Sequence, residues 1–160
     1  MIRPGPPTEL ELDALVRDMR GADVAECLAA GQSPRFALTE SARLSAMCWT
    51  AFDDAGPLCA FGAVRFGMAG APWLLGTDRL HSHRRSLMRL APSYIAAMRK
   101  QFAYLVNFAH ADNGDAVRWL RRIGFVVEPA APHWSSGEPF RRFTLGLGDA
   151  RGWITGGQHV

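Results

Sequence analysis

The stretch NGDAVRWLRRIGF, residues 113–125, constrains the fold of this 160-residue chain more than any other. Asn113 can cap a helix, because its side-chain oxygen can accept a hydrogen bond from a free backbone N–H of the first turn. Residues at the spacing of one helical face follow, at Ala116, Trp119, Leu120 and Ile123. Gly124 can end the helix. Apolar runs at 102–110 and 125–128 flank the stretch, so a helix between two strands is predicted.

The first third of the chain predicts three helices. Their start signals are Thr8 with Glu11, Asp23 with Glu26, and Ser33 with Pro34. Ser, Thr or Asp followed three places on by Glu has the spacing of a capping box, and Pro is favoured at the first helical position. Gly31 can end the second helix, and the third should run to about Leu44. Ile2 and Arg3 can form a short first strand ahead of these helices.

The middle of the chain changes to strands. The apolar runs 46–52 and 58–66 are separated by DDAGP, a turn sequence, so they predict an antiparallel hairpin. WLLGT (73–77) predicts a third strand. Because Pro72 cannot donate a ladder hydrogen bond, this strand should begin at a bulge or a break in pairing.

A long helix and three further strands complete the prediction. Residues 82–100 have helical spacing, with Pro92 inside, which must kink the helix or divide it. The run 102–110 is almost entirely apolar, as in a strand covered on both faces. Strands are also expected at 125–128 and 139–147. Strand 73–77, the helix and strand 102–110 would form a right-handed βαβ crossover.

These elements predict an α+β fold, a mixed and mostly antiparallel sheet with a central βαβ crossover flanked by helices. We expect one domain over residues 1–147 and a Gly-rich tail over 148–160. The composition, 48% hydrophobic and 21% charged, is typical of a soluble globular protein. No apolar run is long enough to suggest a membrane span.

Composition also argues against several classes of function. The net charge is +3, and the Arg doublets are short and lack interleaved aromatic residues, so nucleic acid is not favoured as a partner. The three cysteines form no CxxC pair. His81 and His83 are a weak metal pattern with only Asp78 nearby, so no metal is expected. The N-terminus lacks a signal-peptide core, which favours an intracellular location.

The element order and the 113–125 motif resemble the GNAT (Gcn5-related N-acetyltransferase) superfamily of acyl-CoA N-acyltransferases. GNAT domains commonly show Asn-x-x-Ala-x-x-Leu-Tyr-x-x-x-Gly-Phe, which this chain matches at Asn113, Ala116, Gly124 and Phe125. WLLGT, WLRRIGF and GEPFRRF are further similar to a family of small GNAT-like phage and prophage proteins related to an internal virion protein group. That resemblance implies the bacterial host cytoplasm, or the virion, as the location.

The resemblance implies a site for acetyl-CoA. GNAT domains admit the pantetheine arm through a splay between the fourth and fifth strands, and one strand amide can polarise the thioester carbonyl. By that resemblance the cofactor-binding residues are Trp73, Leu74, Leu75, Gly76, Thr77, Arg84, Arg85 and Asn113. Pro72 could open the splay or mark an ordinary strand start.

The chain departs from the GNAT pattern where the pyrophosphate would bind. The usual Gly-rich loop is replaced by GTDRLHSHRRS, which has no glycine after Gly76. Arg79, Arg84 and Arg85 could bind phosphate through their side-chain charge instead. A solvated basic helix start is the alternative interpretation.

The second departure concerns catalysis. Leu120 stands where many GNAT enzymes have a Tyr that reprotonates the leaving thiolate, and Leu cannot transfer a proton. His110, at a strand end, and Glu26 are candidates for the general base. Their structural alternatives are a strand-end hydrogen bond for His110 and a helix cap for Glu26.

Two functions are therefore compatible with the sequence. The first is an N-acetyltransferase that passes an acetyl group from a CoA thioester to an unknown amine. The second is a non-catalytic phage virion or assembly protein that uses the scaffold to bind phage structural proteins. Fold does not decide between them, because function depends on the site.

Overall fold

The computed structural model describes residues 1–146, so the predicted tail 148–160, with Trp153, lies outside the described residues. The helices are α1 (Glu9–Arg17), α2 (Gly21–Ala29), α3 (Pro34–Leu44), the 3-10 turn η1 (Asp78–His81), α4 (Arg84–Gln101) and α5 (Gly114–Arg122). The strands are β1 (Ile2–Pro4), β2 (Ser45–Asp53), β3 (Gly56–Phe66), β4 (Ala69–Gly76), β5 (Tyr104–His110), β6 (Val126–Val127), β7 (Ala131–Pro132) and β8 (Pro139–Leu145). None of the helices among residues 1–146 is both long and apolar enough to cross a membrane.

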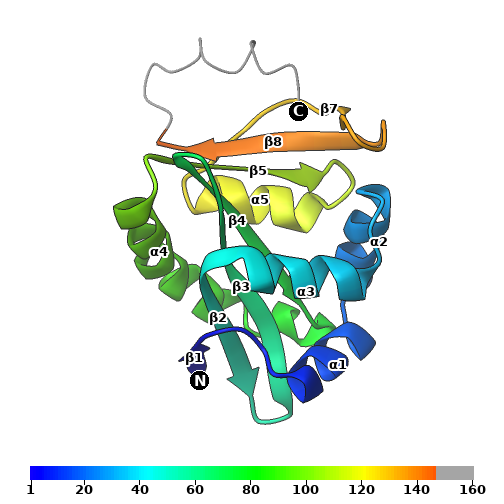
Figure 1. The fold of residues 1–160 in the computed structure, drawn as a ribbon, viewed down its shortest axis with the longest axis vertical. Helices are drawn as coiled ribbons and strands as arrows, with labels where there is room; N and C mark the ends of the chain where they lie inside the picture. Colours follow the sequence, from blue (N-terminus) through cyan, green and yellow to red (C-terminus); the bar gives the residue numbers. More distant parts are fainter. Residues whose placement is uncertain (147–160) are drawn as a thin grey trace.

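All strands belong to one mixed sheet with the order β1-β2-β3-β4-β5-β8-β6, and β7 pairs with β8 (Figure 1). Every pairing is antiparallel except that of β4 with β5, which α4 connects. The predicted α+β class, the mostly antiparallel sheet and the β–α–β connection are confirmed. Because β8 lies between β5 and β6, the last strand of the described residues 1–146 is internal to the sheet.

Helices cover both faces of the sheet. Neighbouring strand residues point to opposite faces, and Ala60 packs with α1, α2 and α3 whereas Cys59 packs with Leu80 and with Leu87 of α4. Farther along the sheet, a cluster that includes Met98 of α4 and Leu120 of α5 packs against β5 and β8. The core is therefore two apolar layers with the sheet between them.

The capping signals of α1 and α3 are confirmed. Thr8 Oγ1 accepts from Glu11 N at 3.4 Å and Glu11 Oε2 accepts from Thr8 N at 2.7 Å, a complete capping box. Ser33 Oγ accepts from Phe36 N at 3.2 Å, and α3 ends at Leu44 as expected. The hairpin of β2 and β3 and the short first strand are also confirmed.

The prediction for α2 is wrong at its start. The helix begins at Gly21 with Arg20 as its N-cap residue, so Asp23 and Glu26 lie inside it and neither caps it. Both carboxylates instead take part in contacts with the sheet. The end of α2 is as predicted, since Gly31 follows it with a positive φ of 80°.

Around α4 one prediction is corrected, and one alternative that the sequence left open is resolved. Strand β4 begins at Ala69, not 73, so Pro72 lies inside the strand and pairs in register with Ala63 of β3. Helix α4 starts at Arg84 and continues through Pro92 to Gln101, so the proline does not divide it.

The predicted packing of β5 and α5 is also modified. Strand β5 is not covered on both faces, because the Phe108 side chain is 37% exposed. Helix α5 turns Val117 and Leu120 into the core, and Val117 was not among the predicted inward residues. Its Asn113 cap is confirmed, with Oδ1 accepting from Ala116 N at 3.3 Å, and Gly124 follows the helix with φ 101°.

Candidate functional site

Strands β4 and β5 pair only at their first residues and then separate. Their parallel register consists of Ala69 with Tyr104 and Gly70 with Leu105. Beyond these pairs the two strands run in different directions, β5 alongside β8 and β4 alongside β3 (Figure 1). One side chain spans the start of the divergence, since Asn107 Nδ2 of β5 donates to the Pro72 carbonyl at 2.9 Å.

The direction of the β4 backbone groups follows from the ladder with β3. Thr77 N donates to the Leu58 carbonyl of β3 at 2.9 Å, so Thr77, Leu75 and Trp73 direct their backbone groups to β3. The residues between them face the divergence. Pro72 has no N–H group, so only its carbonyl points into the divergence. Leu74 directs both its N–H and its C=O into the divergence. Of the five predicted residues 73–77, Leu74 and Gly76 therefore have backbone groups on the β5 side.

A buried cluster of charged side chains lies at the wide end of the divergence. Asp23 Oδ2 accepts from Gly76 N at 2.9 Å, and Asp23 Oδ1 pairs with Arg20 Nη2 at 2.7 Å. Arg20 N also donates to the Gly76 carbonyl at 2.9 Å. Both backbone groups of Gly76 are thus occupied by the N-terminal end of α2, through its N-cap residue Arg20 and through Asp23 in its first turn.

Glu26 links the same helix to β5 and α5. Its Oε2 accepts from the backbone N of His110 at 2.8 Å and from Asn113 Nδ2 at 3.2 Å. The structure therefore brings Glu26, His110 and Asn113 together, three residues that the sequence placed at the site. The Asn113 amide is engaged at both ends, by Glu26 and by Ala116 N.

Burial sets the electrostatics of the two carboxylates. It raises the pKa of Glu26, and the bonds from His110 and Asn113 oppose that shift. It likewise raises the pKa of Asp23, against the attraction of Arg20. A carboxylate with a raised pKa at the wide end of the divergence is a suitable general base, since its proton affinity lies closer to that of the group it must deprotonate.

The His110 ring lies apart from the carboxylates. It packs edge-on against Phe140 with 5.2 Å between ring centroids, and only its backbone N contacts Glu26. Leu120 points away from the site, being 6% exposed within the apolar cluster of β5, β8 and α5. A proton-donating side chain that replaced Leu120 would therefore lie in the apolar core and not at the site.

Basic side chains surround the N-terminus of α4. His81, Ser82, Arg84 and Arg85 line an open cavity of about 270 Å³ there. The first turn of a helix presents free N–H groups, and with guanidinium groups beside them it attracts anions. Arg79 does not reach this cavity, because it bonds to Asp53 at 2.9 Å and to the Pro57 carbonyl at 2.8 Å. No group of side chains among residues 1–146 is arranged to hold a metal ion.

The comparisons with known proteins identify the fold. No sequence-family profile and no curated protein matches the chain. The Bacillus subtilis acetyltransferase solved in complex with CoA has a TM-score of 0.64 at 11% identity, covering 90% of this chain and 96% of that one. A GNAT-family acetyltransferase from Bacillus anthracis has 0.64 at 10%, covering 90% and 93%, and Ard1 from Thermoplasma volcanium has 0.63 at 16%, covering 91% and 95%. The chain therefore has the GNAT fold.

Three residues of the site escaped the sequence analysis. Asp23 was interpreted as a helix cap, because it stands three places before Glu26, and its partner Arg20 was missed with it. Asn107 was missed because it stands inside an apolar run. One sequence signal was available: a charged or amide side chain that a predicted helix or strand would bury needs hydrogen-bond or ion-pair partners. Here those partners are Gly76 and Pro72 of β4.

Proposed function

We propose that this protein is an acyl-CoA-dependent N-acyltransferase acting on an amine. The observation that carries the proposal is the divergence of β4 from β5, with the buried Asp23 and the half-buried Glu26 at its wide end and Arg84 and Arg85 at the helix start. The fold neighbours include an acetyltransferase solved in complex with CoA. The residues at the divergence fit such a cofactor, because Leu74 turns backbone groups to the gap and the arginines lie where phosphate charge could bind.

Acyl-CoA would supply an acyl group activated as a thioester. In this proposal Leu74 N–H holds the carbonyl oxygen as negative charge develops on it during attack. Glu26 accepts the proton that the amine loses as its nitrogen bonds to the carbonyl carbon. Arg84 and Arg85 hold the phosphates by charge, in place of glycine amides. Because Leu120 is buried, water returns a proton to the leaving thiolate.

A second candidate function is a non-catalytic scaffold, as the resemblance to phage virion and assembly proteins implies. Specific contacts favour it. Asn107 ties β5 to Pro72 across the start of the divergence, and Asp23 occupies the Gly76 amide. In that function the phage partner proteins would bind the outer surface and the gap would stay closed.

Thermal unfolding with and without CoA tests the first function. A ligand at about 100 times its dissociation constant adds about 2.7 kcal/mol to the free energy of unfolding, so we expect Tm to rise by several degrees. Arg84→Ala with Arg85→Ala should abolish the rise. Arg121→Ala with Arg122→Ala, a matched exposed pair on α5, should preserve it.

The outcomes separate the two functions. An unchanged Tm at millimolar CoA would contradict acyl-CoA use. A rise in Tm without release of free thiol from acetyl-CoA, across a panel of primary amines, would favour a scaffold that retains CoA binding. An equal loss in both double variants would show that general positive charge, not the α4 site, binds the phosphates.

A further inference from the structure

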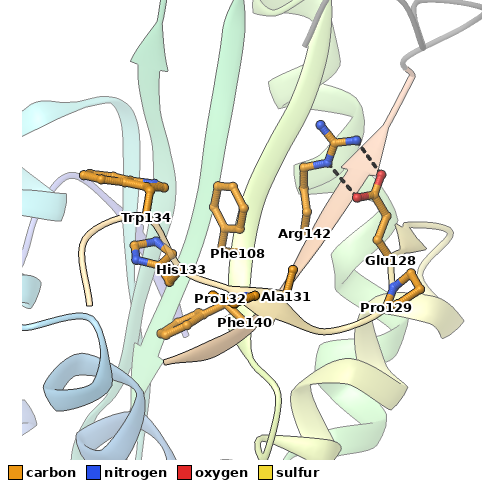
Figure 2. A pocket seen from close by; sticks show the side chains of 9 residues that line it. All are labelled: Phe108, Glu128, Pro129, Ala131, Pro132, His133, Trp134, Phe140 and Arg142. Atoms are coloured by element: carbon orange, nitrogen blue, oxygen red, sulfur yellow. Dashed lines mark hydrogen bonds and ion pairs between the residues drawn. The ribbon is translucent and has the colours of Figure 1, made fainter. Parts of the chain in front are cut away.

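A second cavity lies on the sheet face that α1, α2 and α3 only partly cover. It has a volume of about 190 Å³ and is lined by Phe108, Glu128, Pro129, Ala131, Pro132, His133, Trp134, Phe140 and Arg142 (Figure 2). Phe108 pairs with Arg142, and His110 with Phe140, in the register of β5 and β8, so these side chains share one face. His133 and Trp134, from the loop between β7 and β8, line one side of the cavity.

Four aromatic rings that pack against one another form one wall of this cavity. His133 packs on Phe140 with 4.7 Å between ring centroids, on Trp134 with 5.0 Å and edge-on against Phe108 with 5.5 Å. His133 N donates to the Glu138 carbonyl at 2.8 Å, and Gly137 N donates to the His133 carbonyl at 2.8 Å. These two bonds close the turn from His133 to Glu138, and the imidazole packs against Trp134, which is 84% exposed.

The charges around the cavity give a cation no net attraction. Glu128 is neutralised by Arg142, whose Nε and Nη2 donate to its two carboxylate oxygens at 2.9 and 2.5 Å (Figure 2). Burial lowers the pKa of His133, which favours the neutral imidazole. No unneutralised carboxylate therefore lines the cavity to attract an ammonium group, whereas aromatic faces and two prolines offer flat apolar contacts.

The cavity is smaller than the ~300 Å³ at the lower end of sites for drug-sized ligands, so it fits a single ring system. We propose that it binds an uncharged planar aromatic ring, which packs against the rings of Phe108, His133 and Trp134 that line the cavity. Ring pairs of this kind contribute about 0.5–1.5 kcal/mol beyond the area they bury. A planar ring can make close contact with the flat aromatic walls, whereas a saturated ring of the same size is puckered and makes less contact.

The cavity adjoins the candidate site. Phe108 and His110 project to the same face of β5 two residues apart, which is about 7 Å along a strand. Since the His110 backbone bonds to Glu26, a short chain attached to a ring in the cavity would reach the carboxylate. This extension, in which the ring belongs to the amine acceptor, rests on the proposed function; the ring site itself does not.

Calorimetry with indole, without CoA, tests the ring site. We expect indole to bind and Trp134→Ala to weaken it by about threefold to tenfold, the factor that corresponds to the stacking energy. Trp134 is suited to substitution because it is exposed and its loss leaves no buried hole. Phe36→Ala on α3, which removes an aromatic ring that is 54% exposed, should leave indole affinity unchanged.

Two further probes decide the chemistry of the ligand. Cyclohexanol should bind more weakly than indole, and tetramethylammonium should not compete with it. Equal affinity for cyclohexanol, tighter binding of tetramethylammonium, undetectable indole binding, or equal indole affinity in Trp134→Ala would each overturn the proposal. Because these measurements need no CoA, their failure is distinguishable from failure of the Tm rise with CoA. Tryptamine that binds more tightly than indole in the presence of CoA would support the extension.

Discussion

At the scale of single residues, Glu26 shows how position inside a helix differs from position at its end. At the N-terminus it would have received N–H groups from its own helix, as a cap does. Inside α2 it is half-buried and receives them from β5 and from the N-cap residue of α5 instead. The contacts of Glu26 therefore join α2, β5 and the start of α5. Ionisation of this desolvated carboxyl group lowers the stability of the folded state.

That cost predicts a pH dependence. A carboxyl whose pKa is raised on folding contributes stability that is present below its ordinary pKa of about 4.5 and is lost as the pH rises through the raised value. Glu26→Gln keeps an oxygen that can accept both hydrogen bonds but has no charge to bury. We expect urea unfolding to show the variant gaining free energy of unfolding over wild type as the pH rises from 5 to 8.

A control with the opposite sign is available on α3. The ion pair with Arg43 lowers the pKa of Glu40, so that carboxylate contributes stability above its ordinary pKa which is lost as the pH falls. Glu40→Gln should therefore gain nothing at high pH. A constant difference between Glu26→Gln and wild type at pH 5 and pH 8 would show that the Glu26 charge does not burden the fold.

At the scale of elements, the point where β4 leaves β5 is fixed by close packing. Gly70 is the last β4 residue in register with β5, and the buried Phe102 ring, at the C-cap of α4, lies directly against it. A Cβ at Gly70 would be 2.5 Å from Phe102 Cδ2. Glycine is needed here for space, since its φ is not in the left-handed region.

We expect Gly70→Ala to lower the free energy of unfolding by about 1–3 kcal/mol, because a methyl group forced into a packed site displaces its neighbours. Chemical denaturation would measure it as a lower midpoint. Gly21→Ala at the start of α2 is the matched control, with nothing within 4 Å of the added Cβ, and should be neutral or stabilising by up to about 1 kcal/mol. An equal midpoint for both variants would mean that Phe102 yields easily and does not fix the junction.

Sequence patterns were sufficient for most elements and insufficient for the site. Capping signals and apolar runs are local, so α1, α3, the hairpin and the 113–125 helix could be predicted. The divergence could be expected only through resemblance, because the extent of pairing between β4 and β5 depends on packing such as that of Gly70 on Phe102. Contacts such as Asp23 with Gly76 join residues 53 positions apart, which no local pattern reports.

At the scale of the whole molecule, the parallel pairing of β4 with β5, the single such pair among residues 1–146, organises the candidate function. The antiparallel ladders on either side hold β4 to β3 and β5 to β8, so the two strands can separate while the sheet stays intact. The α2 carboxylates then lie at one end of the divergence, and Arg84 and Arg85 lie in the first turn of α4, the helix that connects β4 to β5. The proposed cofactor would run between these two groups.

Amide chemical shifts during a titration with pantetheine, and then with CoA, test the central claim most directly. We expect the Leu74 amide of β4 to shift with both ligands, because its N–H faces the divergence, while the Thr77 amide, bonded to Leu58 of β3, shifts less. The Arg84 and Arg85 region should respond to CoA alone. A Leu74 amide that stays unchanged while CoA saturates the protein would contradict binding between β4 and β5.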